Sequence, residues 1–162
     1  MSVLPDNLVS LILAEISEPE ANALRLVAIR LSAQGEAVTN RKLPQISGVP
    51  LLPTPDTRAI EILWETTIGY VVLNESYAIF REDLPKATQN LEVVQDPVFD
   101  DFIARQTFAT QEFPGPFQTW RFHSENNLVL VASASEPAVR EIDAEPRWLE
   151  KRGPEIFIRS SG

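Results

Sequence analysis

The sequence has no cysteine, one histidine, one methionine and only six glycines among its 162 residues. The absence of cysteine excludes disulfides, thiolate metal sites and cysteine nucleophiles. None of the glycines forms a phosphate-binding pattern such as G-x-G-x-x-G or G-x-x-x-x-G-K-[ST]. A single histidine without thiolates is poor material for a zinc site. We therefore expect no catalytic residues, no metal site and no cofactor.

Long apolar runs are also missing. No stretch approaches the ~20 residues of a membrane-spanning helix, and the start M-S-V-L-P-D-N-L lacks the basic opening of a signal peptide. These two absences predict a cytoplasmic protein without a membrane segment.

Basic residues are scarce, with 14 Lys and Arg against 23 Asp and Glu, for a formal charge of −9. A negative surface repels phosphate backbones, so we expect no nucleic-acid binding. The same charge favours a basic protein partner, although it also serves solubility.

The length fits one domain with its own core. We divide it into a helical N-terminal part (1–35), a Pro-rich connection (36–58), a sheet core (59–134) and a C-terminal extension (135–162). The prolines of the connection exclude a regular helix over most of it. It is either a surface arm or a loop with a role, and it could hold a short edge strand at 49–52.

The most regular pattern runs from Ala59 to Tyr77. Its apolar residues alternate with other residues, which places them on one face of a strand. These residues are Ile60, Ile62, Trp64, Ile68, Tyr70 and Val72. Because no tight-turn dipeptide interrupts the run, we expect one long strand over 60–73, bent or bulged near 66–69, with its Trp and Tyr facing the core.

The first 35 residues predict two helices, over 2–16 and 18–33. Apolar residues recur at helical spacing, and Ser17 to Glu20 resembles a capping box. A strand over 24–31 is the competing interpretation, because Leu24, Leu26 and Ala28 alternate as well. The Ala-rich composition favours the helix.

Two later segments complete the expected fold. Asp96 and Pro97 are a fitting N-cap and first residue for a helix over 97–105. The runs 117–123 and 128–134 predict a hairpin joined by S-E-N-N. The expected fold class is α+β, an antiparallel sheet of four to six strands with the N-terminal helices and this central helix on one face. The C-terminal extension predicts a short helix at 146–151 and a last edge strand at 155–159.

The pattern W-E-x-x-I-x-Y-x-V-x-N-E-S-Y resembles the core of a group of uncharacterised bacterial proteins. The residues that carry the resemblance are Trp64, Glu65, Ile68, Tyr70, Val72, Asn74, Glu75, Ser76, Tyr77, Phe102, Trp120 and His123. The resemblance covers 60–133, about half of the chain, and implies a shared fold without a known activity.

The candidate binding residues are polar or aromatic groups at strand ends, where a rigid scaffold presents functional side chains. They are Asn74, Glu75, Tyr77, His123 and Trp120. Turn formation and core packing explain the same residues without a ligand. The pairs Glu61 and Glu65, ~13 Å apart along a strand, and Asp100 and Asp101, at a helix start, do not suggest catalysis.

Two functions follow from these observations. The first is a non-enzymatic accessory or immunity-type protein that binds a basic protein partner through its acidic surface. The alternative is a small-molecule-binding protein or hydrolase with a site near Asn74, Glu75, Tyr77 and His123. The lack of a catalytic motif favours the first.

Overall fold

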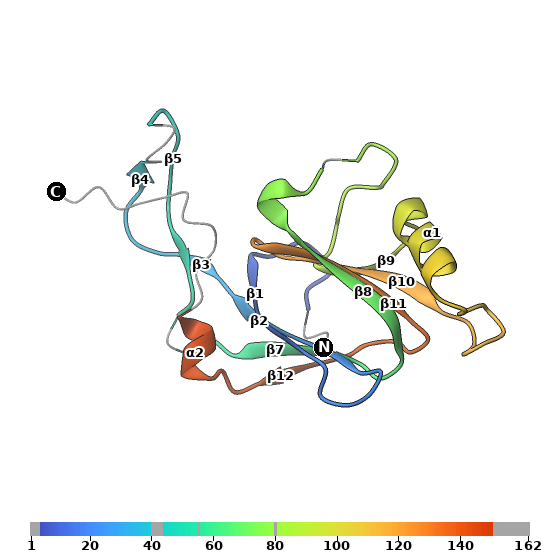
Figure 1. Ribbon diagram of the computed structural model, residues 1–162. Coiled ribbons are helices and arrows are strands. Elements are labelled where there is room, and N and C mark those ends of the chain that lie inside the picture. Colours follow the sequence, from blue (N-terminus) through green and yellow to red (C-terminus); the bar gives the residue numbers. More distant parts are fainter. Residues whose placement is uncertain (1–3, 40–43, 55, 80, 151–162) are drawn as a thin grey trace.

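The structure, a computed structural model, describes residues 4–39, 44–54, 56–79 and 81–150. This part of the chain is mostly β-structure, in two four-stranded antiparallel sheets that share one core (Figure 1). Sheet 1 has the order β1 (Leu11–Ser17), β2 (Leu24–Arg30), β7 (Ala59–Trp64) and β12 (Ala138–Ile142). Sheet 2 has the order β8 (Thr67–Asn74), β11 (Asn127–Ser133), β10 (Gln118–His123) and β9 (Leu91–Val94).

The main core lies between the two sheets. Trp64 of β7, Phe122 of β10 and Val129 of β11 are fully buried in it. The other buried members are Leu4, Leu11, Leu13, Leu24, Leu26, Ala28, Ile60, Ile62 and Val131. Because each large apolar side chain contributes roughly 1.5–3 kcal/mol when buried, this cluster is the principal source of stability.

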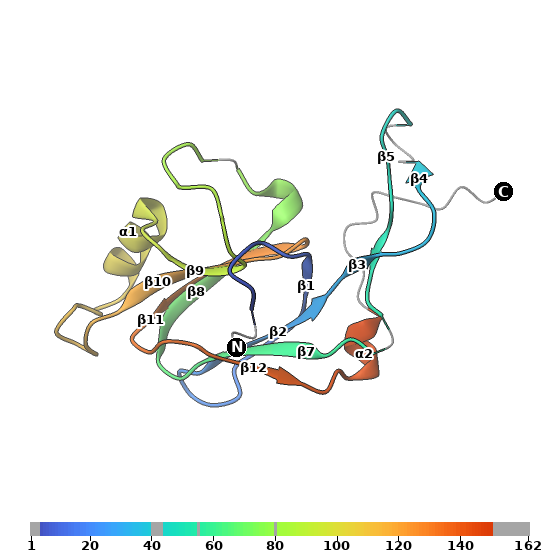
Figure 2. The ribbon, with the colours of Figure 1, turned by 180° about the vertical axis from the view of Figure 1, so that it is seen from behind.

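One helix covers the outer face of each sheet. The short helix α2 (Pro146–Leu149) places Trp148 on the outer face of sheet 1, beside Val27 and Ile29. The helix α1 (Pro97–Gln106) places Phe99 and Ile103 on the outer face of sheet 2. The two helices lie on opposite sides of the molecule (Figure 2). Both faces of both sheets are therefore at least partly covered.

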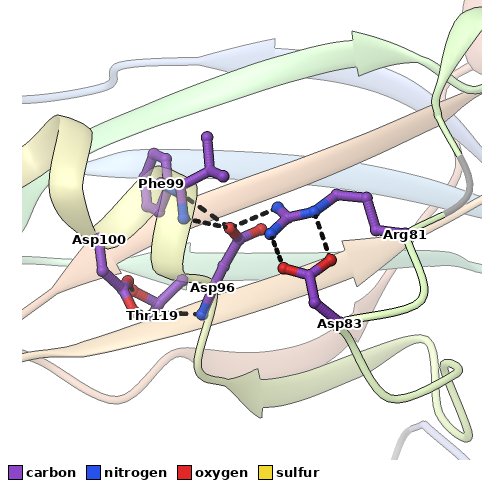
Figure 3. A network of polar contacts seen from close by, with 7 residues as sticks. Arg81, Asp83, Asp96, Phe99, Asp100 and Thr119 are labelled. Carbon is purple, nitrogen blue, oxygen red and sulfur yellow. Dashed lines mark hydrogen bonds and ion pairs between the residues drawn. The ribbon is translucent and has the colours of Figure 1, made fainter.

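The N-terminus of α1 is fixed by a polar network (Figure 3). Asp96 is the N-cap, as expected, and its Oδ1 accepts the N–H groups of the second and third helical residues, both at 3.1 Å. Arg81 donates to the same oxygen at 2.7 Å. Asp100 accepts the N–H of Asp96 at 3.1 Å and the hydroxyl of Thr119 at 2.6 Å. The network joins α1 to β10 and to the segment around Arg81.

The Pro-rich segment belongs to an arm that extends away from the sheets (Figures 1 and 2). Its inner pair is β3 (Ser32–Ala33) with β6 (Leu51–Leu52), and its outer pair is β4 (Val38–Thr39) with β5 (Ser47–Gly48). The short strand expected at 49–52 is present as β6.

The predicted N-terminal helices are wrong, because these residues form β1 and β2. In β2, Leu24, Leu26 and Ala28 face the core between the sheets, whereas Val27 and Ile29 face α2. A strand that is buried on both faces has a continuous apolar run instead of an alternation, and such a run also satisfies helical spacing. The apparent capping box lies in the β1–β2 connection, where Asn22 has a φ of 66°.

The predicted single strand over 60–73 is also wrong. Its residues form β7 and β8, which belong to different sheets and meet at a corner. Ser135 stabilises this corner, since its Oγ accepts the N–H groups of Glu65 at 3.1 Å and Thr66 at 3.0 Å. A bulge leaves Ile68 unpaired, because Ala132 pairs with Gly69 and Ser133 with Thr67. Ile68 consequently packs toward α1, while Trp64 and Tyr70 contact the central core.

The α+β fold class is therefore a wrong prediction, and the described chain is mostly β. The hairpin over 117–134 is confirmed by β10 and β11. The central helix occurs at the expected position, on the outer face of sheet 2. Sheet 1 draws on the first 35 residues and on β12, so the sheets extend beyond 59–134. The strand expected at 155–159 lies outside the described residues.

Candidate binding surface

Three of the predicted binding residues lie together at the end of β8. Asn74 ends the strand and caps a short 3-10 helix, η1 (Glu75–Tyr77), by accepting the N–H of Ser76 at 3.0 Å. The N–H of Glu75 donates to the carbonyl of Asn126 at 3.1 Å. The Tyr77 side chain is 84% exposed. These residues form an exposed corner of sheet 2.

The other two predicted residues lie on β10. Trp120 is half-buried against the central core, and its Nε1 has no hydrogen-bond partner among the described residues. The backbone of His123 donates to the carbonyl of Asn90 at 2.8 Å and accepts from its Nδ2 at 3.0 Å. Because β11 separates β10 from β8, the two groups of residues are two strands apart, about 9–10 Å.

Two pockets lie elsewhere on the described chain. One, of about 270 Å³, lies at the base of the arm, and a smaller one lies near Leu4 and Leu91. None of the five predicted residues lines either pocket. Asn74, Glu75 and Tyr77 are instead exposed on the surface.

The edge strands of the two sheets differ in whether other residues cover the side that has no neighbouring strand. The free side of β1 is covered by the turn between β10 and β11. There the Asn126 amide accepts the N–H of Leu13 at 2.8 Å and donates to its carbonyl at 3.0 Å. Asn90 forms the same pair of bonds with Val9, at 2.9 and 2.8 Å. These side chains occupy the positions that a neighbouring strand would take.

Two other edge strands are protected by composition or length. β12 carries Arg140 and Glu141 and follows Pro137, and charges and prolines on an edge discourage further pairing. β9 has only four residues, one of them Glu92. Neither strand offers a long uncharged edge.

In the described part of the chain, the backbone edge of β8 is closed only at its first residue, where the N–H of Thr67 donates to the carbonyl of Asn22 at 2.7 Å. This strand is the longest of the described chain, has eight residues from Thr67 to Asn74 without a charge, and none of them is buried. Among the described strands it pairs only with β11. A long, uncharged edge is a template for another strand.

The direction of the free backbone groups follows from the ladder. The last pair of the β8–β11 ladder is Asn74 with Asn127. One residue farther along, the N–H of Glu75 donates to the carbonyl of Asn126, so this next pair is a hydrogen-bonded one. Because bonded and non-bonded pairs alternate in an antiparallel ladder, Leu73 and Val71 are the bonded positions. The peptide groups of Tyr70 and Val72 therefore point away from β11 and are available to another strand.

Apolar side chains continue this edge to η1 and beyond. Their exposed fractions are 38% for Val72, 45% for Leu73, and 84% for both Tyr77 and Ile79. We name these four side chains, with the β8 backbone edge, the β8 surface. Sequence reasoning identified Tyr77 but missed the other three, since which strand lies at an edge depends on tertiary pairing.

Acidic residues surround the β8 surface. Glu65 and Glu75, both exposed, flank the two ends of the strand. Glu18 accepts the hydroxyl of Tyr70 at 3.1 Å. Burial raises the pKa of Tyr70, and the hydrogen bond and charge of Glu18 raise this pKa further. Tyr70 is thus a neutral donor at pH 7 that joins the β1–β2 connection to β8.

Among the described residues, no group of three or more His, Asp or Glu side chains is arranged to hold a metal ion. Neither helix of the described chain has the length and hydropathy needed to span a membrane. Comparisons with protein-family models, with curated proteins and with solved structures gave no significant match.

Proposed function

We propose that this protein is a non-enzymatic binding protein that accepts an extended segment of a basic protein partner along the β8 surface. The observation that carries the proposal is the edge of β8 from Tyr70 onward, which pairs with no other described strand, whereas the other three sheet edges are covered, charged or short. In strand addition, backbone hydrogen bonds supply affinity and side chains supply specificity. Here the outward peptide groups of Tyr70 and Val72 would supply the backbone hydrogen bonds. The specificity would come from the side chains of the β8 surface, which are Val72, Leu73, Tyr77 and Ile79.

The charge of the protein supports a basic segment as the occupant. The chain carries a formal charge of −9, and Glu65 and Glu75 flank the uncharged strand. A second copy of the chain would bring the same acidic ends and the same net charge to the interface. A partner strand with Lys or Arg on both sides of an apolar centre instead gains attraction at each end, which raises the association rate.

The experiment selects short random peptides on the immobilised protein and compares two lysine variants. Val72→Lys places a charge on the β8 edge, whereas Val93→Lys changes a comparably exposed valine, 47% exposed, on the edge strand β9. We expect peptides with alternating apolar residues between basic ones. Their affinity should fall at least about tenfold for Val72→Lys, equivalent to 1.4 kcal/mol, and change little for Val93→Lys.

Two further measurements test whether the peptide binds as a strand along β8 and whether charge contributes to its affinity. Bound peptide should slow amide hydrogen exchange at Tyr70 and Val72, and binding should weaken between about 50 mM and 500 mM salt. Peptides that bind both lysine variants equally well would contradict the β8 edge as the site. A dimer of the wild-type protein that Val72→Lys dissociates would identify a second copy as the occupant and contradict the basic partner.

A further inference from the structure

The larger pocket, of about 270 Å³, lies where sheet 1 continues into the arm. The residues that line it include two arginines, Arg30 and Arg58, and three residues with hydroxyl groups, Ser32, Thr54 and Thr57. This concentration of donors is notable in a chain with only 14 basic residues. None of these groups takes part in the β8 surface, which belongs to sheet 2.

The register of sheet 1 places the two arginines opposite each other. Ile29 of β2 pairs with Ala59 of β7, and one further step along the antiparallel ladder brings Arg30 opposite Arg58. Their side chains share the face of Ala28 and Ile60, two residues along each strand. Like charges directly opposite each other on neighbouring strands destabilise a sheet. An anion between them removes this cost.

The two guanidinium groups are partly free to bind a ligand. Arg58 forms an ion pair with Asp143 at 2.6 Å, in which the two side chains are 53% and 93% exposed. Exposed pairs of this kind contribute little and exchange readily with water. The Arg30 side chain is exposed and forms no hydrogen bond or ion pair with another described residue. The guanidinium group is planar and always charged, and two of its N–H groups can bind both oxygens of a carboxylate or phosphate.

The hydroxyl wall adds at least one donor. Thr54 and Thr57 form a turn in which their hydroxyl oxygens lie 2.6 Å apart, and Thr57 Oγ1 also accepts the N–H of Thr54 at 3.0 Å. Whichever hydroxyl donates in the pair, the other one keeps a proton for a different acceptor. Both side chains line the pocket, so this proton is available to a bound oxygen.

We infer that this pocket binds a small carboxylic acid, with its carboxylate between Arg30 and Arg58. Glu141 on β12 also lines the pocket, and Asp143 pairs with Arg58, so two carboxylates balance the two guanidinium groups. Because the site has no excess positive charge, a carboxylate monoanion costs less to place there than a phosphate dianion. The volume lies just below the range of drug-sized ligand sites, so it suits a small molecule. This site is independent of the proposed function.

The test uses sodium propionate, titrated at constant ionic strength and followed by NMR of the arginine Nε–H groups, with inorganic phosphate as a second arm. We expect saturable shifts at Arg30 and Arg58, and at least about tenfold weaker binding to Arg30→Gln. Arg30→Lys keeps the positive charge but loses the paired N–H donors of the guanidinium group, so the affinity of this variant for propionate should be intermediate. Arg105→Gln is the matched control, because Arg105 is 73% exposed and, among the described residues, pairs only with Asp101.

Stability separates lost binding from lost folding. Arg30→Gln removes the opposed charges, so its melting temperature should equal or exceed that of the wild type without propionate. Added propionate should raise the melting temperature of the wild type and of Arg105→Gln, but not that of Arg30→Gln. Phosphate that binds as tightly as propionate would overturn the carboxylate assignment. Shifts of equal size in Arg30→Gln, or no saturable shift with either anion, would overturn the site.

Discussion

The side-chain amide of Asn126 pairs with both backbone groups of Leu13, 113 residues earlier in the chain. Asn126 lies in the turn between two strands of sheet 2, whereas Leu13 lies on an edge strand of sheet 1. The two bonds therefore close the free edge of β1 and join the sheets at one end. Ser124 donates to Asn126 Oδ1 at 2.9 Å and thereby orients the amide.

Replacing this amide tests its contribution to folding. Asn126→Asp keeps the shape but loses the donor to the Leu13 carbonyl and places two acceptors against each other. We expect the free energy of unfolding to fall by about 2–3 kcal/mol, since an unsatisfied buried polar group costs ~1–3 kcal/mol. Urea denaturation gives the value. In the control Asn127→Asp, the bond lost is an exposed one of 3.3 Å to Leu73, and the expected loss is below about 1 kcal/mol. Equal losses would contradict the role of Asn126.

Glu61 is the centre of a row of alternating charges across the outer face of sheet 1. It is 5% exposed, and its carboxylate pairs with Arg25 at 2.6 Å and with Arg140 at 2.5 Å. Arg25 also pairs with Glu15 at 2.9 Å. Glu61→Gln leaves Arg25 with half of its partners in a partly buried site. We expect a loss of about 2–4 kcal/mol at pH 7, against less than about 0.5 kcal/mol for the exposed Glu65→Gln.

This loss should depend on pH in a defined direction. Burial raises the pKa of Glu61, but hydrogen bonds and charges from Arg140 and Arg25 outweigh burial and bring the pKa below its ordinary value of 4.5. A carboxyl group with a lowered folded pKa stabilises the protein above the unfolded value and loses this contribution as the pH falls through the folded value. The difference between wild type and Glu61→Gln should therefore be largest at pH 7 and shrink below pH 4.5. Urea denaturation across this range measures it, and a constant difference would contradict the assignment.

Asp96 combines a helix cap with an ion pair, so its removal should be costly. Asp96→Ala loses the acceptor for two N–H groups of α1 and for Arg81. A lost N-cap alone costs ~0.5–2 kcal/mol, and with the ion pair we expect about 2–3 kcal/mol in thermal or urea denaturation. Asp101→Ala lies on the same helix but loses only an exposed pair with Arg105, for which about 0.5 kcal/mol or less is expected. Similar losses in the two variants would show that the cap adds nothing.

Local signals predicted the parts of the fold that local interactions determine. Asp96 and Pro97 start α1 because capping and a fixed φ act within one turn, and S-E-N-N forms the turn of the hairpin for a similar reason. Asn74, Glu75 and Tyr77 lie together because they are neighbours in sequence. Trp120 and His123 are separated from them by a strand, and no pattern in the sequence contains that pairing.

The errors arose where distant residues decide the structure. Leu24 to Arg30 is a strand because sheet 2 and Trp148 cover its two faces, and neither is visible from the segment itself. The break between β7 and β8 depends on Ser135, about 70 residues later. The opposition of Arg30 and Arg58 follows from the register of two strands whose sequences do not reveal their pairing.

Gly69 provides a test of the contact between β8 and α1. A Cβ at this position would lie 2.9 Å from Cδ1 of Ile103, which is 2% exposed on α1. We expect Gly69→Ala to cost about 1–2 kcal/mol, because the buried isoleucine must move away in a packed interface. Ile103→Val removes the obstructing carbon and by itself costs ~0.5–1.5 kcal/mol. The double variant should then lose less than the sum of the two single losses, by at least about 0.5 kcal/mol in urea denaturation. Additive losses would show that the two positions do not touch, and α1 would have to sit farther from β8.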